Sequence, residues 1–468
     1  MITNNEKNRT RTVAQFVDME MLIPQDHLVR LVDRTIDFEF IREKVRHLYS
    51  EDKGRPSIDP VVLFKMVFIQ YMFGIKSMRQ TVKEIEVNVA YRWFLGFDFI
   101  EKVPHYSTFS KNYERRFANS TIFDDIFKEI LDKVNQEGLL DKTTLFIDST
   151  HTKAYANKRK IDNRIVEASY NKYVEALRNE INEARVKEGK KPLSKEMKKE
   201  IISRTDPECG MFHKGEKEKQ LAYSSQVACD ESGWVTNVKV YPGNMNDNNS
   251  GADFVEDINK DDEVENYVLD AGYTGPILLN EIFKAGKKPI VPYTAPKGSK
   301  MRRKSDSEAP LPSTSYKYDE ENDVYICPLG TILKCKGINS QGNLVYKTST
   351  KDCKNCPWKN RCTNQKHKEI QRHFLERATE KAREIRLSPL GKELYPLRKV
   401  TIERCFAQAK FNHNLGFTFL RGLKKNQARC LIIFACHNLK KLAKILNKST
   451  SNIIAELRFF FRKVFFSY

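Results

Sequence analysis

The stretch TTLFIDSTHTK (143–153) is a short apolar run that leads into an acid, Asp148, between turn-forming residues. This pattern predicts a β-strand. The stretch NYVLDAGYTG (266–275) repeats it, with Asp270 at the end of the run and a glycine turn behind. Neighbouring strands lie about 4.8 Å apart, so the two carboxylates would meet within about 5 Å if these strands pair. We therefore expect the acids to share a divalent metal, although either acid alone is also typical of a hydrogen-bonded turn.

The segments around these two stretches predict a mixed α/β sheet. LAYSSQVACDESGWVTNVKVYP (221–242) alternates apolar and polar residues on both sides of a turn, as a β-hairpin does. ILLNEIFKAGKKPIVPYT (277–294) predicts a helix followed by a strand. Residues 157–204 carry fourteen basic and eight acidic residues at helical spacing. They predict an exposed helix or helical hairpin that is inserted in the sheet, and the order of elements indicates the α/β class.

The first 140 residues predict an all-α domain. DPVVLFKMVFIQYMFGI (59–75) opens with Asp-Pro, a helix-start signal, and is apolar nearly all round, which indicates a buried helix. Residues 77–97 and 104–117 predict two short helices across a tight turn. The second carries Arg115 and Arg116, so the pair is similar to a helix-turn-helix DNA reader. A plain helical bundle is the alternative interpretation.

A third acid, Glu403, lies in the helical stretch RKVTIERCFAQAKFNHNLGFTFLRGL (398–423), which is otherwise cationic. Lys410 follows two helical turns later and therefore lies on the same face, and Arg404 flanks the acid. This arrangement suits metal binding by the carboxylate together with phosphate contact by the cations. An intrahelical ion pair is the alternative.

The positive charge of the chain is concentrated towards its C-terminal end. The chain has 81 Lys and Arg against 61 Asp and Glu, a net charge of +20, and residues 398–468 hold fifteen of these cations but only two acids. Such clustering beside aromatic residues favours contact with a phosphate backbone over a solvated helix face. We expect DNA contacts from Arg398, Arg404, Lys410, Arg421, Lys424 and Lys425, together with Arg115 and Arg116.

The composition excludes several classes of protein. With 40% apolar and 30% charged residues, the chain is globular and not disordered. Its apolar runs, such as LIIFAC (431–436), fall far short of the roughly 20 residues that a membrane-spanning helix needs. The stretch MITNNEKNRTRTVAQF at the start has no apolar segment of signal-peptide type, and ten cysteines are too sparse for a disulfide framework. We expect a cytoplasmic protein that does not enter a membrane.

A cysteine-rich module follows a Pro-, Ser- and Lys-rich linker at 295–325. Five cysteines and one histidine fall within residues 327–367, and a tetrahedral zinc site is the favoured interpretation. The module also has too few apolar residues to build a core alone, so metal binding would supply its folding free energy. An iron–sulfur cluster and free thiols are the alternatives. The expected zinc ligands are Cys327, Cys353, Cys356 and Cys362, with Cys335 and His367 nearby.

The other cysteines and two histidines predict structural roles. Five cysteines are scattered along the chain and are typical of core residues. We interpret two histidines, one near the first acid and one in the FHKG stretch, as structural and not as general bases. These residues are Cys209, Cys229, Cys405, Cys430, Cys436, His151 and His213.

The three acids in their local contexts, LFIDST, VLDAGYTG and TIERCFAQAK followed by FLRGL, resemble the DDE transposases of bacterial insertion sequences. DPECGMFHKGEKEKQLAYSSQVACDESG (206–233), YPGNMND and the helical stretch around GRPSIDPVVLFKMVFIQYMFGIKSMRQ are similar to that family too. The resemblance covers about residues 15–445. It implies an RNase H-like catalytic core, with the strands of Asp148 and Asp270 as parallel neighbours and Glu403 on a helix packed on the sheet.

The resemblance also implies the domain organisation. We expect an all-α DNA-binding domain at 1–140 and the first part of the catalytic core, with its charged helical insertion, at 141–295. An insertion at 296–373 would contain the Cys-rich module, 326–367. Residues 374–468 would complete the core and add a basic tail. The family's helix signature of Tyr, Arg, Glu and Lys matches Tyr395, Arg398, Glu403 and Lys410, with Lys399 as the alternative to Arg398 because the Arg-to-Glu spacing is one residue longer.

The implied activity is transposition. The protein would bind terminal inverted repeats, cleave DNA by two-metal hydrolysis and join the freed 3′-OH to target DNA. Two Mg²⁺ ions, which Mn²⁺ would replace, would be held by the three acids, with Asp148 bridging both ions. The expected assembly is a homodimer or higher oligomer on double-stranded DNA. An RNase H-like nuclease that cleaves without joining, and a DNA-binding protein that has lost catalysis, are the alternatives.

Overall fold

The computed structural model describes residues 16–50, 54, 56–167, 172–194, 197–214, 218–293, 311, 315–339 and 342–465. The chain forms two compact units. The first, here called the helical unit, comprises residues 1–140, 407–418 and 424–468. The second, here called the sheet unit, comprises residues 141–406 and 419–423. Segments from both ends of the sequence therefore share the helical unit.

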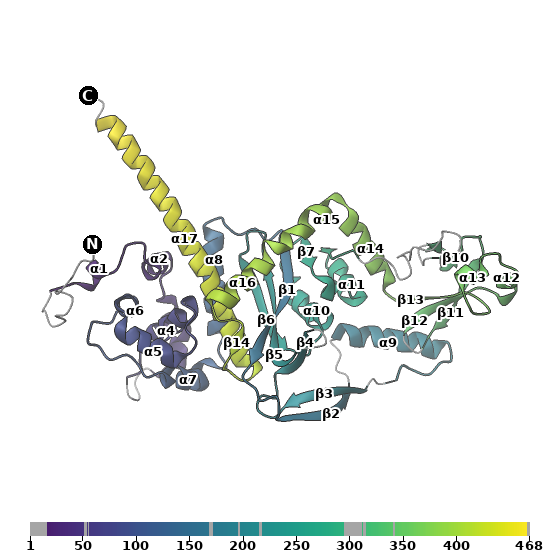
Figure 1. The fold of residues 1–468 in the computed structure, drawn as a ribbon, viewed down its shortest axis with the longest axis horizontal. Coiled ribbons are helices and arrows are strands. Elements are labelled where there is room, and N and C mark those ends of the chain that lie inside the picture. The colour runs from purple at the N-terminus through teal and green to yellow at the C-terminus, as the bar shows by residue number, and fades with distance from the viewer. Residues whose placement is uncertain are drawn as a thin grey trace, which may run out of the picture. The chain divides into compact units, whose positions relative to one another are not determined.

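Short helices build most of the helical unit, and α4 lies at its centre (Figure 1). The Asp59 side chain accepts the N–H of Val61 at 2.8 Å and Pro60 fills the first helical position, so α4 begins where the Asp-Pro signal predicts. Eleven of its residues are buried, as an apolar helix requires. The helices of this unit are α1 (Met19–Leu22), α2 (Leu28–Thr35), α3 (Phe40–Val45), α4 (Pro60–Met72), α5 (Met78–Val87), α6 (Val89–Leu95), α7 (Ser107–Asn112), α8 (Ile122–Gln136), the second half of α16 (Ile402–Asn412) and nearly all of α17 (Leu423–Phe465).

The expected DNA-reading helices are not joined by a tight turn. The first of them splits at Asn88, whose side chain caps α6, into α5 and α6. Residues 96–106 then separate α6 from α7, whereas a helix-turn-helix uses a turn of about three or four residues. This connection is held by the buried Arg92, which donates to the carbonyl oxygens of Asp98 (2.7 Å) and Glu101 (2.5 Å).

Helix α17 packs with the N-terminal helices. Its apolar run at 431–436 is fully buried, and Cys436 Sγ lies 3.9 Å from the carbonyl oxygen of Phe68 in α4. The expected segment 374–468 is therefore divided between the two units and does not belong to the sheet as a whole. The physical reason is that a helix that is apolar on several sides needs other helices to cover it. The part of that segment up to Phe406, with residues 419–423, belongs to the sheet unit. The side chains of the expected basic tail, beyond residue 448, lie outside the described part of the structure.

A mixed sheet forms the centre of the sheet unit, as the sequence predicts (Figure 1). Strand β1 pairs antiparallel with β5 and parallel with β7, which in turn pairs parallel with β8. Strand β5 also pairs antiparallel with β6, its partner in the predicted hairpin, and with β4. The strands are β1 (Thr144–Ala154), β4 (Gly210–Lys214), β5 (Glu218–Cys229), β6 (Val235–Pro242), β7 (Asn266–Leu269) and β8 (Lys288–Ile290); the short β14 (Phe417–Thr418) belongs to the helical unit.

Helices cover this sheet and share one hydrophobic core with it. Residues of β1 and β7, such as Ile147 and Leu269, pack in the same cluster as Phe254 of α10, Leu279 of α11 and Ala382 of α14. The helices concerned are α10 (Asp247–Ile258), α11 (Pro276–Lys284) and α14 (Glu376–Leu387), and α15 (Pro389–Leu394) follows α14 in the sequence. This packing fixes β1 and β7 as rigid neighbours.

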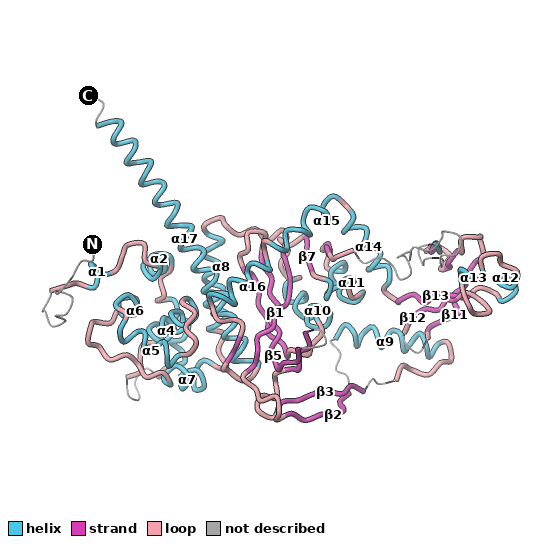
Figure 2. The backbone as a smooth tube through the Cα atoms, viewed as in Figure 1, coloured by secondary structure: helices cyan, strands magenta, loops and turns pink. Residues whose placement is uncertain are grey.

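The charged segment at 157–204 is only partly helical, which corrects the expected helical hairpin. Strands β2 (Ile161–Glu167) and β3 (Met197–Ser203) pair antiparallel along their whole lengths, and α9 (Lys172–Lys187) lies between them in the sequence. Because Ile161 pairs with Ser203, the segment leaves and re-enters the sheet unit at neighbouring positions. Figure 2 shows this two-stranded ribbon beside the main sheet.

The Cys-rich segment forms a second, antiparallel sheet with its own core, which corrects the expectation of a module without one. Its strand order is β13-β12-β11-β10-β9, around buried Tyr316, Leu333 and Tyr346. The apolar share of the segment is low, but tyrosine rings supply the buried area. The strands are β9 (Lys317–Asp319), β10 (Val324–Ile326), β11 (Ile332–Ile338), β12 (Asn343–Lys347) and β13 (Glu369–His373), and α12 (Thr350–Lys354) and α13 (Lys359–Cys362) lie between the last two.

The two segments added to the main sheet pack on each other. Leu177 and Ile181 of α9 form a buried cluster with Ile338 of β11. Figure 2 shows α9 leading towards the sheet that contains β11. The guanidinium of Arg185, which is 8% exposed, donates to the carbonyl oxygens of Lys191 (2.9 Å) and Ile338 (2.8 Å) and also to that of Asn339. We call α9 together with β9–β13 the insertion lobe.

Candidate active site

Asp148 and Asp270 lie side by side because their strands are parallel neighbours. In the β1–β7 ladder Ile147 stands opposite Leu269, so the next residue of each chain is an acid at the end of the shared pairing. Asp270 directly follows β7, as predicted. Asp148 does not end its strand, because β1 continues to Ala154 along β5. The predicted adjacency of the two strands is confirmed.

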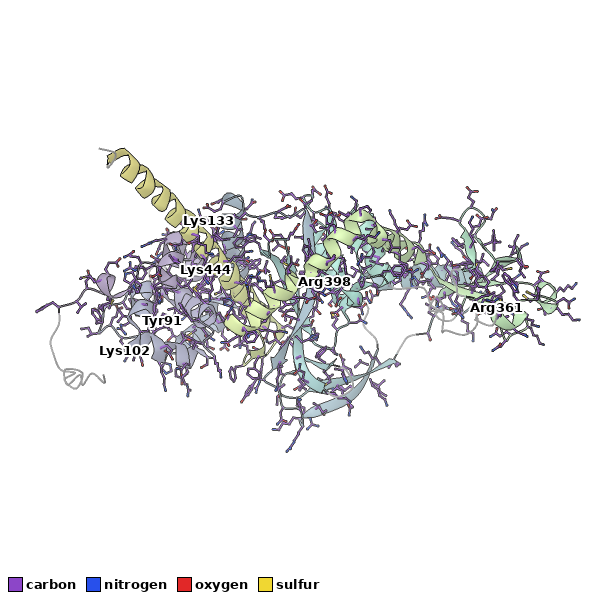
Figure 3. All side chains as sticks on the ribbon, turned by 45° about the horizontal axis from the view of Figure 1, so that its top comes forward. Tyr91, Lys102, Lys133, Arg361, Arg398 and Lys444 are labelled. Carbon is purple, nitrogen blue, oxygen red and sulfur yellow. The ribbon has the colours of Figure 1, made fainter. Side chains whose placement is uncertain are left out.

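A buried guanidinium joins the two acids. Arg398, in the 3₁₀ turn η6 (Tyr395–Lys399), donates from Nη2 to Asp148 Oδ2 at 2.7 Å and from Nη1 to Asp270 Oδ1 at 3.0 Å. The Arg398 side chain is 7% exposed, Asp148 17% and Asp270 47%. Figure 3 labels Arg398 close to where α16 begins. The sequence analysis assigned this residue to DNA, but its charge here is directed at the acids.

Glu403 belongs to the same electrostatic centre. Burial opposes the charge of Arg398, but Asp148, Asp270, Tyr395 and Glu403 outweigh it and raise the pKa of Arg398. Glu403 lies in the first turn of α16, with its side chain exposed. Two of the three predicted acids therefore contact Arg398 directly, and Glu403 acts on it only through its charge.

Burial dominates the protonation of Asp148. It raises the pKa of this carboxyl to about 6, against the lowering effect of Arg398 and of the Ser149 N–H, which donates to Asp148 Oδ1 at 2.8 Å. The negative charges of Asp270 and Asp247 raise it further. A carboxyl in such surroundings is stabilised in its charged form by an added cation.

The donor set fits a divalent metal in its chemistry. Carboxylate oxygens are the ligands that Mg²⁺ uses, and oxygens of Asp148 and Asp270 already converge on one cationic group. Among the described residues, no three His, Cys, Asp or Glu side chains stand close enough to hold a metal ion as arranged. Glu403 would therefore have to move towards the two aspartates to complete a three-acid site.

Asp247, the first residue of α10, is a fourth acid near this centre that the sequence analysis did not assign. Its Oδ1 accepts from Gln226 Nε2 at 3.3 Å. Burial raises the pKa of Asp247, hydrogen bonds from Ser149 and Gln226 lower it, and the charge of Asp270 raises it. The local pattern gave no signal for it, because four residues separate Asp247 from the end of β6, whereas the other two aspartates directly end apolar runs.

Glycines let the two motif segments approach each other. A Cβ atom on Gly272 would lie 2.7 Å from Asp247 Oδ2, and one on Gly251 would lie 2.7 Å from the ring of Tyr273. The Tyr273 hydroxyl donates to Gln226 Oε1 at 2.5 Å, so the buried ring continues the hydrogen-bond network that reaches Asp247. The stretches YPGNMND and VLDAGYTG thus form one packed structure beneath the acids.

Cations expected to contact DNA lie on both units. In α16, Arg404 and Lys410 are exposed. Arg421 is exposed in the sheet unit, with its guanidinium 5.6 Å from the ring centre of Tyr155.

The other four predicted DNA-contacting residues come together in the helical unit. Lys425 Nζ pairs with Glu114 at 3.2 Å, and Lys424 Nζ lies 3.3 Å from Asn119 Oδ1. Glu114 directly precedes Arg115 and Arg116, of which Arg115 is exposed. The two basic segments, some 300 positions apart in the sequence, therefore form one surface.

The predicted zinc ligands are close to one another without forming a ligand cluster. Tyr316 OH lies 2.8 Å from Cys362 Sγ, and burial, then Cys362, Cys327 and Cys353, raise the pKa of this tyrosine. Cys327 Sγ accepts the N–H of Thr331 at 3.2 Å. One of the four thiols thus contacts the tyrosine hydroxyl directly, whereas Cys353 Sγ lies 3.0 Å from the Thr348 hydroxyl.

The remaining structural assignments mostly hold. The five scattered cysteines are all buried, as expected of core residues: Cys209, Cys229, Cys405, Cys430 and Cys436. His151 stacks on Phe212 with ring centres 3.5 Å apart, consistent with a structural role. His213 is exposed on β4, so it is not a buried core residue, and its structural role stays a prediction.

Comparison with known proteins gives two family matches. Residues 17–115, within the helical unit, match the family described as Transposase domain (DUF772). Residues 326–443, from the Cys-rich sheet through Glu403 into α17, match the family described as Transposase DDE domain. No curated protein and no solved structure is similar enough to be matched. None of the described helices is long and apolar enough to cross a membrane. Two transposase matches on one chain, with the paired aspartates between them, support its assignment as an insertion-sequence DDE transposase.

Proposed function

We propose that this protein is an active transposase that binds the terminal inverted repeats of its element, cleaves DNA and joins the 3′-OH ends to target DNA. The observation that carries this proposal is the pair Asp148 and Asp270 at the end of one parallel ladder, where both acids share Arg398 as their cation. Phosphodiester hydrolysis needs an activated water and a stabilised leaving oxygen. Carboxylates in this arrangement are suited to provide both through bound metal.

The sheet supports an RNase H-like core. Strands β6, β5, β1, β7 and β8 follow one another in space, the first three antiparallel and the last three parallel. In this order the first strand in sequence lies in the middle, which puts Asp148 at the centre of the sheet. Strand β1 is therefore held by β7 up to Ile147 and by β5 through Asp148 and beyond.

Each residue of the centre would have a distinct task. Asp148, Asp270 and Glu403 would hold two Mg²⁺ ions, or Mn²⁺ in their place, and these ions would activate water and stabilise the leaving oxygen. The Ser149 N–H orients Asp148 through its Oδ1, leaving Oδ2 directed at the cation. Asp247 fixes Ser149 and Gln226 beneath the acids.

The DNA would be held by cations of both units. Lys424, Lys425, Arg115 and Arg116 support a phosphate-contacting surface on the helical unit, and Arg404 and Lys410 support contacts near Glu403. Such contacts make affinity fall steeply with salt. Sequence preference would come from the helices of residues 77–117, and a homodimer or higher oligomer would hold the two ends.

Structural zinc in the insertion lobe remains a prediction. Cys362 and Cys327, which both pack against the cluster of Tyr316, support it, since a shift of these thiols together with Cys353 and Cys356 would close a tetrahedral site. The tyrosine core means that the sheet would not depend on this metal for its fold.

The test compares Asp148→Asn, Asp270→Asn and Glu403→Gln in the full chain with the wild type. The substrate is DNA carrying the inverted repeats that flank the gene. Each variant should lose cleavage and joining by roughly 10³-fold or more while end binding stays within a few-fold, because the acids hold metal and do not read DNA.

Asp257→Asn is the matched control, since this acid of α10 pairs with Lys239 at 2.7 Å in an exposed position. It should cleave like the wild type. Near wild-type cleavage by an acid variant in Mg²⁺ would remove that residue from the site. If the wild-type protein cleaves DNA but never joins the ends, the protein is a nuclease and not a transposase. If it only binds DNA, it is a DNA-binding protein without catalysis.

A further inference from the structure

Arg398 occupies the place between the two aspartates that a metal ion would need. Its guanidinium contacts Asp148 at 2.7 Å and Asp270 at 3.0 Å, and its side chain is 93% buried. Within the described part of the chain, its Nε is a buried donor without a hydrogen-bond partner. The two carboxylates therefore hold the guanidinium in place, and its Nε–H makes no hydrogen bond to a described residue that would stabilise this position further.

Both oxygens of Asp148 are already in use. Oδ1 accepts the Ser149 N–H at 2.8 Å, and Oδ2 accepts Arg398 Nη2. The Ser149 bond belongs to the strand backbone and is fixed by the pairing of β1 with β5. Oδ1 keeps one further lone pair, but the Ser149 N–H already draws on this oxygen, so a metal ion that binds Asp148 competes with the guanidinium for Oδ2.

A guanidinium and a divalent ion at that oxygen repel each other. Two positive groups a few ångströms apart in a largely buried site interact strongly, because little water screens them. The site also cannot simply lose its cation, since Asp148 and Asp270 would then face each other unpaired. One positive group has to replace the other.

Resting on the proposed function, we propose that Arg398 is a built-in competitor for the catalytic metal. It holds Asp148 and Asp270 in position while no divalent ion is bound, and it must leave Asp148 Oδ2 when one binds. The metal affinity of the free protein is then lower than the acids alone would give. If Arg398 instead organised the acids permanently, its loss would weaken metal binding. The two roles therefore predict opposite changes in metal affinity when Arg398 is replaced.

The test is a titration of Mn²⁺ into the full-length, DNA-free protein by calorimetry, checked by the electron paramagnetic resonance signal of free Mn²⁺. Arg398→Gln should bind Mn²⁺ about 10-fold more tightly than the wild type, or better. Arg377→Gln is the control, because this residue is 61% exposed on α14 and pairs with Glu320. It should match the wild type. Equal or weaker binding by Arg398→Gln would overturn the proposal.

Thermal unfolding guards against a variant that folds poorly. Without metal, Arg398→Gln should melt below the wild type, and Mn²⁺ should raise its Tm more than it raises that of the wild type. Arg398→Lys keeps one charge but cannot span both carboxylates, so its affinity should lie between the two. A lysine variant that binds Mn²⁺ no more tightly than the wild type would contradict the proposal even if the glutamine variant does not fold.

The outcomes separate this inference from the proposed function. Wild-type binding that Asp148→Asn abolishes, without tighter binding by the Arg398 variants, would overturn only the competition. Absence of Mn²⁺ binding in the wild type and in every Arg398 variant would overturn both. Binding that emerges only when Arg398 is replaced would support the competition in its strongest form.

Discussion

The sequence predicts a metal site at the acid centre and another in the Cys-rich sheet, and the two sites differ in how the structure positions their candidate ligands. Asp148 and Asp270 are brought together by the register of two strands and share Arg398 as their cation. The thiols of the insertion lobe lie at the edge of a tyrosine core, and Cys362 and Cys327 have separate hydrogen-bond partners in Tyr316 and Thr331.

The difference shows what each site depends on. Strand pairing positions the acids whether or not metal is bound, and the cost of their proximity is offset by a guanidinium. In the insertion lobe the aromatic core determines the fold, so any metal would be added to a sheet that already exists. Metal should therefore change chemistry at the first site and only local order at the second.

Beyond the three acids themselves, the largest expected effect concerns Asp247 beside them. Replacing Asp247 by Ala should lower cleavage about 10- to 100-fold, because residues that orient metal-binding carboxylates carry effects of that size. End binding should stay unchanged. Asp257→Ala, on the same helix and with the same change in charge, is the control for cleavage of inverted-repeat DNA. Equal rates for the two variants would exclude Asp247 from the centre.

The sequence identified the acids because their signal is local. An apolar run ending in Asp148 or Asp270 indicates a strand, and strand spacing then gives the distance. Arg398 and Asp247 could not be assigned in this way, because their roles arise from contacts across 250 and 21 positions of the chain. Arg398 also resembled its cationic neighbours, and only burial distinguishes it from them.

The same limit applies to the fold. Hydrophobic pattern predicts α4 and the β5–β6 hairpin well, because each is local. It failed for the Cys-rich segment, where single tyrosines such as Tyr316 and Tyr346 from short strands build a core that no periodic pattern announces. It also failed for α17, whose partners lie at the opposite end of the sequence.

A smaller effect is expected in the insertion lobe. Arg185→Met should lower the stability of β11 and β12 by about 2 kcal/mol, because carbonyl oxygens that the buried guanidinium satisfies would lose their donor. Hydrogen exchange should rise in residues 332–347 and stay unchanged at β1 and β7. Equal loosening of both sheets would contradict the view that the lobe is held by its own contacts.

The smallest effect concerns metal in the lobe. If zinc is bound, about one ion per chain should be found, and a chelator should speed hydrogen exchange mainly in residues 350–362, which include α12 and α13. The strands around Tyr346 should stay protected. Unfolding of the whole Cys-rich sheet on chelation would show that the tyrosine core is insufficient. A protein without metal whose four thiols react in the native state would exclude the zinc site.

The most direct test of the central claim, that Asp148, Asp270 and Glu403 act by holding metal, is a change of metal preference. Asp270 is 47% exposed, so a cysteine at this position should fit the site. A thiolate is a poor ligand for Mg²⁺ and a better one for softer ions, so Asp270→Cys should not cleave inverted-repeat DNA in Mg²⁺ but should regain cleavage in Mn²⁺. Near wild-type cleavage in Mg²⁺, or the same inactivity in both metals, would contradict the claim.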